Sequence, residues 1–339
     1  MSQKRSGGQK RSGAGRGGGS GQRSGPASGG GGGRGGSGRG GSEGRGGGGS
    51  RGAQRPGQGA GRGGPNRGGT GRSGSGRGGA DNLWGDKADT GLGGTQVEGR
   101  QAVRELLLAG RRRCREIYLS TEVERAGIIE DIIGLAREMR VTVQEVSRTK
   151  LDAMSRTDAP QGVIARAAQI SETSLEDLIE SEPAPFLLAV DGVTDPGNLG
   201  ALLRIADCAG VTGVILPRHR AVHITPTVTK AAAGAVEYLP MALVGGLATA
   251  IDSLKKADVW TVGLDMAGSE SIHDLKVATE AVCLVLGSEG KGLSRLVRER
   301  CDFIASIPIH GHLDSLNVAS AGAVAAYEVA RRRTDAGVA

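Results

Sequence analysis

The chain has 339 residues, including 62 glycines, and a net charge of +7. The charge is unevenly divided: residues 1–80 carry 15 basic residues, one acidic residue and 37 of the glycines, and the rest of the chain has a net charge of −7. No apolar run could span a bilayer and no apolar segment follows the basic start, so we expect neither a transmembrane helix nor a secretory signal. We therefore expect the protein to be cytoplasmic. The four cysteines lie far apart without CxxC spacing, which predicts reduced core residues and argues against a zinc site or disulfides.

Residues 1–94 predict a disordered Gly/Arg/Ser-rich basic tail and linker. The first 80 contain no Phe, Tyr or Trp and so have nothing to bury. A flexible Arg-rich arm binds phosphate backbones by releasing counterions, without sequence preference. The tail therefore favours RNA as a partner, although a solubilising tail without a partner is the alternative.

Residues 95–168 predict a small α/β domain. Apolar residues at helical spacing predict helices over 97–108 and 124–139, and short apolar or alternating runs predict strands over 116–119, 141–146 and 162–168. The run from Ser171 to Pro185 contains several acidic residues and two prolines, which is typical of a hinge. We therefore assign residues 169–184 to a linker.

Residues 185–333 predict a second α/β domain, followed by a short C-terminal tail over 334–339. Continuous apolar runs are typical of strands buried on both faces, and helical patterns fill the intervals between them. Strands alternating with helices indicate a parallel sheet covered on both sides. The expected strands are 185–190, 213–216, 260–264, 281–286 and 303–307, and the expected helices are 199–209, 225–235, 245–256, 293–300 and 315–333.

Three loops follow expected strands and precede expected helices. They are 191–200 (DGVTDPGNLG), 287–293 (GSEGKGL) and 306–321 (SIPIHGHLDSLNVASA). The carboxyl ends of parallel strands are where open α/β sheets bind ligands. We therefore expect the three loops to converge on one pocket, with RNA brought to it by the rest of the chain.

Individual residues in these loops have competing interpretations. Asn198 stands where a helix N-cap would stand, and Asp314 or Ser315 is placed to cap the last helix. Arg204 is either a partner for Asp207 or a functional cation. Glu289 is either a solvated turn charge or a site residue.

Several familiar motifs are excluded at these loops. GSEGKG matches neither GxGxxG nor GxxxxGK[ST], so its glycines indicate close backbone approach to a planar ligand, not a conventional nucleotide site. His310 and His312 have no third ligand nearby, which argues against a metal. No GxSxG elbow surrounds Ser315.

Together, NLGALLR at 198–204, LGSEGKGL at 286–293 and IPIHGHLDSLNVASA at 307–321 resemble, in order and interval, the three motifs of the SpoU (TrmH-type) branch of the SPOUT methyltransferases. The resemblance covers Pro185 to about Arg333. The preceding domain, with EGRQAV and QGV, resembles the small RNA-binding domain of the bacterial 23S rRNA guanosine-2′-O-methyltransferase group. Relatives often carry His before QGV, where this chain has Pro160.

This resemblance implies a trefoil-knotted parallel sheet, S-adenosyl-L-methionine bound at Gly287, Ile307 and Leu316, and a homodimer with the active site near the subunit interface. It implies methylation of a ribose 2′-hydroxyl in RNA, a guanosine of 23S rRNA or of a ribosome precursor, without a metal. Arg204 is the key catalytic residue by this analogy, with Asn198, Glu289, Ser315 and Asn317 completing the site. The alternatives are a tRNA ribose methyltransferase, an antibiotic-resistance rRNA methyltransferase, and a non-catalytic RNA-binding or ribosome-assembly protein.

Overall fold

The computed structural model describes residues 91–219 and 223–338. The basic tail and all but the last four residues of the linker predicted over 1–94 lie outside this described part. The described residues contain a four-stranded sheet, which with its helices we call the small domain, and a seven-stranded sheet, which with its helices we call the large domain. Both domains belong to one compact unit.

The small domain is built on a sheet of order β1-β4-β2-β3. Apolar residues three and four apart on α1 and α2, among them Val103, Leu106, Ile129 and Ile132, are buried in its core, as their spacing predicts. Its elements are β1 (Gln96–Glu98), α1 (Arg100–Ala109), β2 (Cys114–Ser120), α2 (Ile128–Glu138), β3 (Thr142–Val146), α3 (Arg148–Met154) and β4 (Val163–Ala167).

The helix predicted from Val97 begins later than expected. Residues Gln96–Glu98 form β1, which pairs with β4, and Gly99 follows with a φ of 96° that an α-helix does not allow. Val97 is therefore buried as a strand residue. The prediction failed because a single apolar residue fits the helical period of about 3.6 residues and the strand period of about 2 residues equally well.

The large domain is a parallel sheet of order β7-β6-β5-β10-β8-β11-β9. The predicted strands and helices are found, all but β8 with shifted ends, while β7, β9 and α4 were not predicted because they are short. The elements are α4 (Leu175–Ile179), β5 (Phe186–Asp191), α5 (Pro196–Cys208), β6 (Gly213–Pro217), α6 (Pro226–Ala231), the 3-10 helix η1 (Ala235–Glu237), β7 (Met241–Val244), α7 (Leu247–Lys256), β8 (Trp260–Leu264), β9 (Glu270–Ser271), the 3-10 helices η2 (Ile272–Asp274) and η3 (Lys276–Thr279), β10 (Val282–Gly287), α8 (Arg295–Arg300), β11 (Phe303–Ser306) and α9 (Val318–Asp335).

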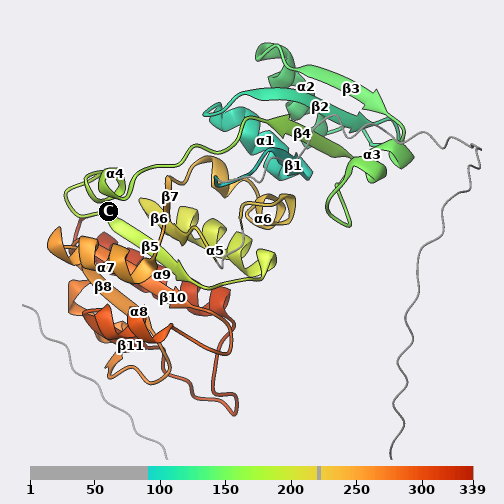
Figure 1. The fold of residues 1–339 in the computed structure, drawn as a ribbon. Helices are drawn as coiled ribbons and strands as arrows, with labels where there is room; N and C mark the ends of the chain where they lie inside the picture. The colour runs from blue at the N-terminus through green and yellow to red at the C-terminus, as the bar shows by residue number, and fades with distance from the viewer. Residues whose placement is uncertain (1–90, 220–222, 339) are drawn as a thin grey trace, which may run out of the picture. The chain divides into compact units, whose positions relative to one another are not determined.

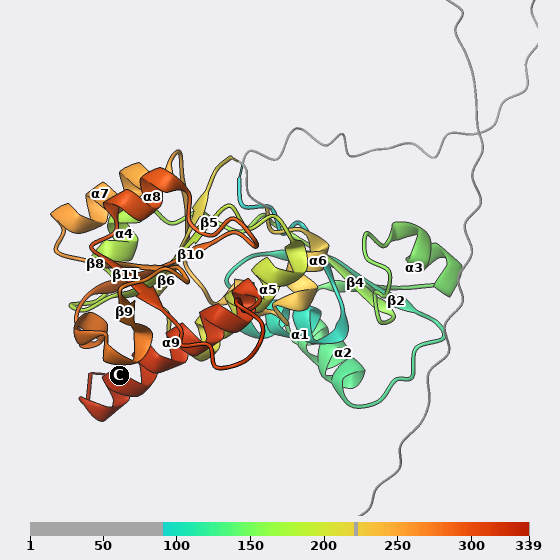
Figure 2. The ribbon, with the colours of Figure 1, turned by 90° about the horizontal axis from the view of Figure 1, so that it is seen from below.

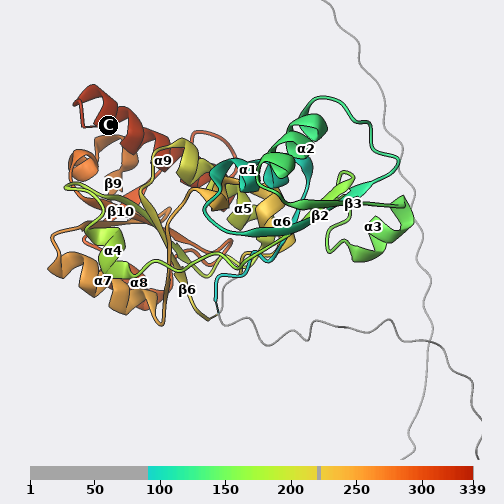
Figure 3. The same cartoon turned by 90° about the horizontal axis from the view of Figure 1, so that it is seen from above.

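Helices cover both faces of this sheet, as the continuous apolar strands predict. Phe186, Leu188 and Val190 of β5 share one core with residues of α5, α6 and α9. Leu187 and Ala189, which point the other way, share a second core with residues of α4, α7 and α8. Figures 2 and 3 show α5 and α9 on one side of the strands and α7 and α8 on the other, and Figure 1 shows the same elements from a third direction.

The strand register brings four carboxyl ends to one edge. Gly287, the last residue of β10, lies opposite Asp191, the last residue of β5. Leu264 of β8 lies opposite both Leu286 of β10 and Ala305 of β11. From β5 the chain adds β6 and β7 on one side, whereas β8, β11 and β9 lie on the other side, beyond β10. The order of the strands therefore reverses between β5 and β10, and open α/β sheets form a ligand crevice at such a switch point.

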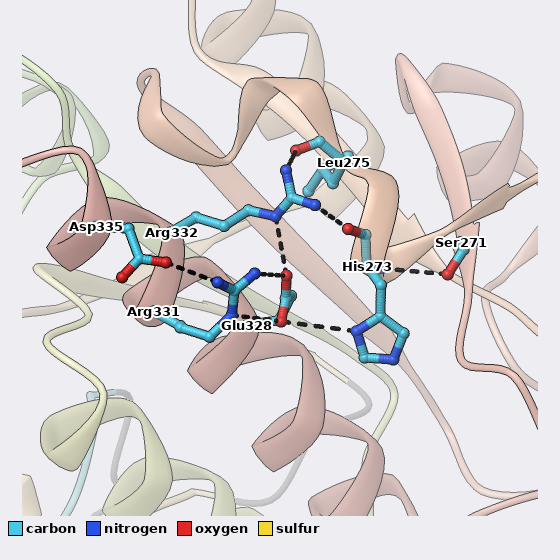
Figure 4. A network of polar contacts seen from close by, with 7 residues as sticks. All are labelled: Ser271, His273, Leu275, Glu328, Arg331, Arg332 and Asp335. Atoms are coloured by element: carbon cyan, nitrogen blue, oxygen red, sulfur yellow. Dashed lines mark hydrogen bonds and ion pairs between the residues drawn. The ribbon is translucent and has the colours of Figure 1, made fainter. Parts of the chain in front are cut away.

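A carboxylate network anchors α9, as Figure 4 shows. Glu328 accepts hydrogen bonds from Arg331 and Arg332 and lies 3.6 Å from Nδ1 of His273. The hydrogen bond from Arg331, followed by that from Arg332, holds the pKa of Glu328 at about 2, against the opposing effect of burial. Arg332 also donates to the carbonyls of His273 and Leu275. The network thus ties α9 to η2.

Candidate active site

A cavity of about 820 Å³ opens over the carboxyl ends of β8, β10 and β11. Six predicted site residues line it: Gly287, Glu289, Ile307, Ser315, Leu316 and Asn317. The loops after β8, β10 and β11 therefore meet there, as the sequence predicted for the last two. The third predicted loop, 191–200, contributes no lining residue, so Asn198 lies outside the cavity wall. The remaining wall consists of residues 264–266, Leu286, Ser288, 290–292, Ala305, Ile309, Asp314, Val318 and Ala321.

The loop after β10 folds back on itself. The N–H of Ser288 donates to the carbonyl of Gly292 at 3.0 Å, and the N–H of Gly292 donates to the carbonyl of Ser288 at 2.9 Å. A Cβ on Gly287 would lie 2.2 Å from the backbone carbon of Gly292, so only glycine fits there. The close approach predicted from the glycines is therefore, at Gly287, an approach of the loop's own backbone.

The last helix begins three residues later than a cap at Asp314 would place it, and two residues later than a cap at Ser315 would. Asn317 is the N-cap: its Oδ1 accepts from the N–H of Ala319 at 2.9 Å and of Ser320 at 3.3 Å. The predicted capping by Asp314 or Ser315 is wrong, because the chain from Pro308 to Leu316 is an exposed loop. Asn317 keeps its Nδ2 group free to contact other residues.

Asn198 is likewise not a cap. The side chain of Asp195 caps α5 by accepting from the N–H of Asn198 at 2.7 Å, and Pro196 is the first helical residue. This leaves the Asn198 side chain free, and its Nδ2 donates to Oε1 of Glu289. The cap and the site residue are thus different side chains on one turn.

Three side chains, from the first turn of α5, the loop after β10 and the N-cap of α9, form one network beside the cavity. Nδ2 of Asn317 donates to Oε1 of Glu289 at 3.1 Å and to Oδ1 of Asn198 at 3.0 Å. Oε1 of Glu289 therefore accepts from both amides. Because Asn317 also caps α9, the network is fixed to the start of that helix.

The cavity wall is acidic. Asp265, Glu289 and Asp314 line it, and Lys291 is the only cationic side chain among its lining residues. Asp265 lies at the carboxyl end of β8 and is 3.4 Å from Nε of Arg298, outside the wall. Such a surplus of carboxylates favours a ligand that carries positive charge.

Comparison with known proteins identifies the family. The model of the SpoU rRNA Methylase family matches residues 185–327, and a model described as RNA 2′-O ribose methyltransferase substrate binding matches residues 96–173. YacO of Bacillus subtilis, named as a TrmH family tRNA/rRNA methyltransferase, is 38% identical over 71% of this chain and 97% of its own length. The chain belongs to the SpoU methylase family. A protein of the same description from Staphylococcus aureus is 39% identical over 72% of this chain and 98% of its own.

Solved structures of SpoU methyltransferases share the fold. AviRb from Streptomyces viridochromogenes, crystallised with AdoMet, superposes with a TM-score of 0.61 at 25% identity, covering 70% of this chain and 90% of AviRb. An rRNA methyltransferase from Sinorhizobium meliloti gives a TM-score of 0.59 at 27% identity, covering 70% of this chain and 87% of its own. The parallel sheet preceded by a substrate-binding domain is therefore the SPOUT methyltransferase architecture.

Arg204 lies outside the cavity of this SpoU protein. Six residues advance an α-helix by about 9 Å and turn it by about 240°, so Arg204 and Asn198 leave α5 from different faces. Arg204 is exposed, does not line the cavity, and forms no ion pair or hydrogen bond with any residue that the structure describes. It does not pair with Asp207, whose pKa is raised first by burial and then by Glu105.

His310, His312 and Cys208 lie at the surface of the SpoU fold. His310 and His312 are exposed, and no group of His, Cys, Asp or Glu that could hold a metal exists within 91–219 and 223–338. No helix in that described part combines the length and apolarity that a membrane span requires. Cys208 is exposed on α5, which corrects its assignment to the core. Asp265 was missed, although its place after a parallel strand was a usable signal.

Proposed function

We propose that this SpoU family protein methylates the 2′-oxygen of a ribose in RNA with S-adenosylmethionine as the donor, and that the target is a guanosine of 23S rRNA. The observation that carries the proposal is the network of Asn198, Glu289 and Asn317, which joins α5 to two residues in the wall of a cofactor-sized cavity.

The residues present fit this donor. Ligand pockets are typically about 300 to 1,000 Å³, and the cavity of about 820 Å³ falls within that range. Ile307 and Leu316 offer apolar surface to a purine ring, and Asp265 and Asp314 can face the cationic groups of the donor. When bound, S-adenosylmethionine supplies an electrophilic methyl group on a sulfonium.

On the acceptor side, Glu289 and the two amides would orient the ribose while Arg204 binds a phosphate and stabilises negative charge developing on the 2′-oxygen. Arg204 is unsuited to remove the hydroxyl proton itself, because a guanidinium keeps its own proton at any physiological pH. Ser315 on the cavity wall is placed to contact the ribose or the donor.

A homodimer would explain the position of Arg204 outside its own cavity. The proposed active site lies near the subunit interface, so Arg204 would act from there. Exposed apolar residues support such an interface: Val324 and Tyr327 lie one turn apart on α9, and α9 packs against α5, which carries Arg204. We also propose that the chain before α9 forms the trefoil knot of SPOUT enzymes.

The choice of rRNA over tRNA rests on the small domain. A separate substrate-binding domain suits a large RNA, and the basic tail would add affinity for phosphate without choosing the site. Pro160 stands where relatives often have His, so the target nucleotide is the part of the proposal that needs direct mapping. The protein would act in the cytoplasm, on 23S rRNA or a ribosome precursor.

Arg204→Lys tests the proposed role of the guanidinium. Lysine keeps the charge and loses the bidentate fork, so methyl transfer should fall by at least tenfold while donor binding is unchanged. Arg295→Lys on exposed α8 is the matched control and should keep full activity. Near-normal turnover of Arg204→Lys would contradict the bidentate role, whereas RNA binding without methyl transfer by the wild type would favour a ribosome-assembly protein.

A further inference from the structure

Arg112 and Glu237 form a buried ion pair that joins the small domain to the large one. Arg112 lies between α1 and β2, and Glu237 is the last residue of η1, 125 positions later. Their side chains are only 6% and 2% exposed. Nε of Arg112 donates to Oε2 of Glu237 at 2.8 Å and Nη2 donates to Oε1 at 2.6 Å, so both carboxylate oxygens accept a hydrogen bond from the guanidinium.

The same guanidinium binds both segments that lead into and out of the small domain. Nη1 of Arg112 donates to the carbonyl of Gly94, just before β1, and to the carbonyl of Ala168, just after β4, the latter at 2.6 Å. One side chain therefore connects the beginning and the end of the small domain to a single carboxylate of the large domain.

Smaller contacts surround this pair. The hydroxyl of Tyr238 donates to Oε2 of Glu105 at 2.7 Å, and Nζ of Lys230 donates to the carbonyl of Ala159 at 2.6 Å. A Cβ on Gly234 would lie 2.3 Å from Cβ of Glu105, so Gly234, which precedes η1, packs directly against α1.

The energetics of the pair indicate a role in geometry more than in stability. Desolvating two charges offsets most of their attraction, and replacing a buried pair by apolar residues is often neutral for stability. Four acceptors around one planar guanidinium, however, are satisfied together in one arrangement only. An apolar contact of the same size would tolerate small rotations that this pair does not.

We propose that Arg112, through Glu237, is a positioning residue: it fixes the small domain on the large domain and thereby sets which ribose of a bound RNA reaches the cavity. The inference rests on the proposed function, because it requires RNA held by one domain and methylated in the other. A displacement of about 1 Å at a reacting centre costs on the order of 100-fold in rate, so a loosened domain contact would be visible in catalysis.

The test uses the full chain with the pair replaced as a unit, Arg112→Met with Glu237→Leu, because a single replacement would leave an unpaired buried charge. Arg112→Lys is a second variant that keeps the charge and loses the fork. The control is Arg300→Gln with Asp252→Asn, which removes a half-exposed pair between α7 and α8. Spin labels at Lys150→Cys and Lys256→Cys, in a Cys208→Ser background, report the distance between the two domains.

The double variant should bind S-adenosylmethionine within twofold of the wild type, lose at least tenfold in kcat/KM on the mapped RNA, and methylate riboses beside the normal one. Its spin-label distance distribution should broaden, and Arg112→Lys should fall between it and the wild type. Unchanged distances together with methylation at the single original nucleotide would overturn the proposal. A wild type that methylates no RNA would refute the proposed function instead, and the distance measurement would still report on the domain contact.

Discussion

Replacing Asn317 by aspartate separates the two tasks of this residue. Asn317 caps α9 through Oδ1 and joins Asn198 and Glu289 through Nδ2. Aspartate keeps the capping oxygen but replaces the donor by a second carboxylate oxygen beside Glu289. We therefore expect Asn317→Asp to fold almost normally and to lose activity.

The magnitudes favour a small effect on stability. Two charges separated by the 3.1 Å that now joins Nδ2 of Asn317 to Glu289 repel by about 1.3 kcal/mol in water-like surroundings. The favourable interaction of a negative charge with a helix N-terminus stabilises the folded state by about 0.3 to 1 kcal/mol. The net loss of under about 1 kcal/mol corresponds to a Tm decrease of at most about 4 °C in a folded region of this size. Loss of one positioned donor, by contrast, costs on the order of 100-fold in kcat.

The assay pairs thermal unfolding with methyl transfer to RNA. Asn317→Ser is the uncharged control, since serine also caps helices, and it should match the aspartate variant in activity loss without the repulsion. Asn317→Ala should lose the cap as well, with a further destabilisation of about 1 kcal/mol. Wild-type turnover by Asn317→Asp would refute the role assigned to the amide network.

Three further predictions concern other parts of the chain. Gly287→Ala forces a Cβ to within 2.2 Å of the Gly292 backbone, so calorimetry should show at least a tenfold loss of S-adenosylmethionine affinity, and normal binding would contradict the loop geometry. The pKa of Glu328 is about 2, below its ordinary 4.5, so its stabilisation is complete above pH 4.5 and is lost as the pH falls towards 2. Glu328→Gln should therefore have a lower free energy of unfolding than the wild type at pH 7, and this difference should shrink as the pH falls. A difference that does not change with pH would contradict its assignment to the ionised carboxylate. Removal of residues 1–80 should weaken RNA binding at low salt without moving the modified nucleotide, and a changed target would show that the tail selects the site.

The periodicity of the sequence predicted the fold where segments are long and buried. β8 has the predicted bounds, and the continuous apolar runs correctly indicated a sheet covered on both faces. Short elements failed for a physical reason. β9 has two residues and α4 has five, too few for a repeating pattern to emerge.

The sequence predicted which loops form the site, but it did not predict which side chain in each loop caps a helix and which one contacts another loop. Several residues that can cap a helix lie together in each loop, and local rules cannot rank them. Contacts between distant segments determine which side chain is the cap. Glu289 accepts hydrogen bonds from the amides of both Asn198 and Asn317, and Asp195 caps α5. Local reasoning cannot anticipate such a choice.

The ion pair between Arg112 and Glu237 gave no signal at all in the sequence. Arg112 is the middle residue of three consecutive arginines, and its partner is 125 residues away. Only the folded chain distinguishes this buried arginine from its exposed neighbours Arg111 and Arg113.

The most direct test of the proposed activity is to incubate the full protein with methyl-labelled S-adenosylmethionine and total RNA, digest the RNA to nucleosides, and map the labelled position. The proposal predicts label on a ribose 2′-oxygen, recovered as 2′-O-methylguanosine from a single site in 23S rRNA. Label on a base, or no label in any RNA while the donor binds, would contradict it.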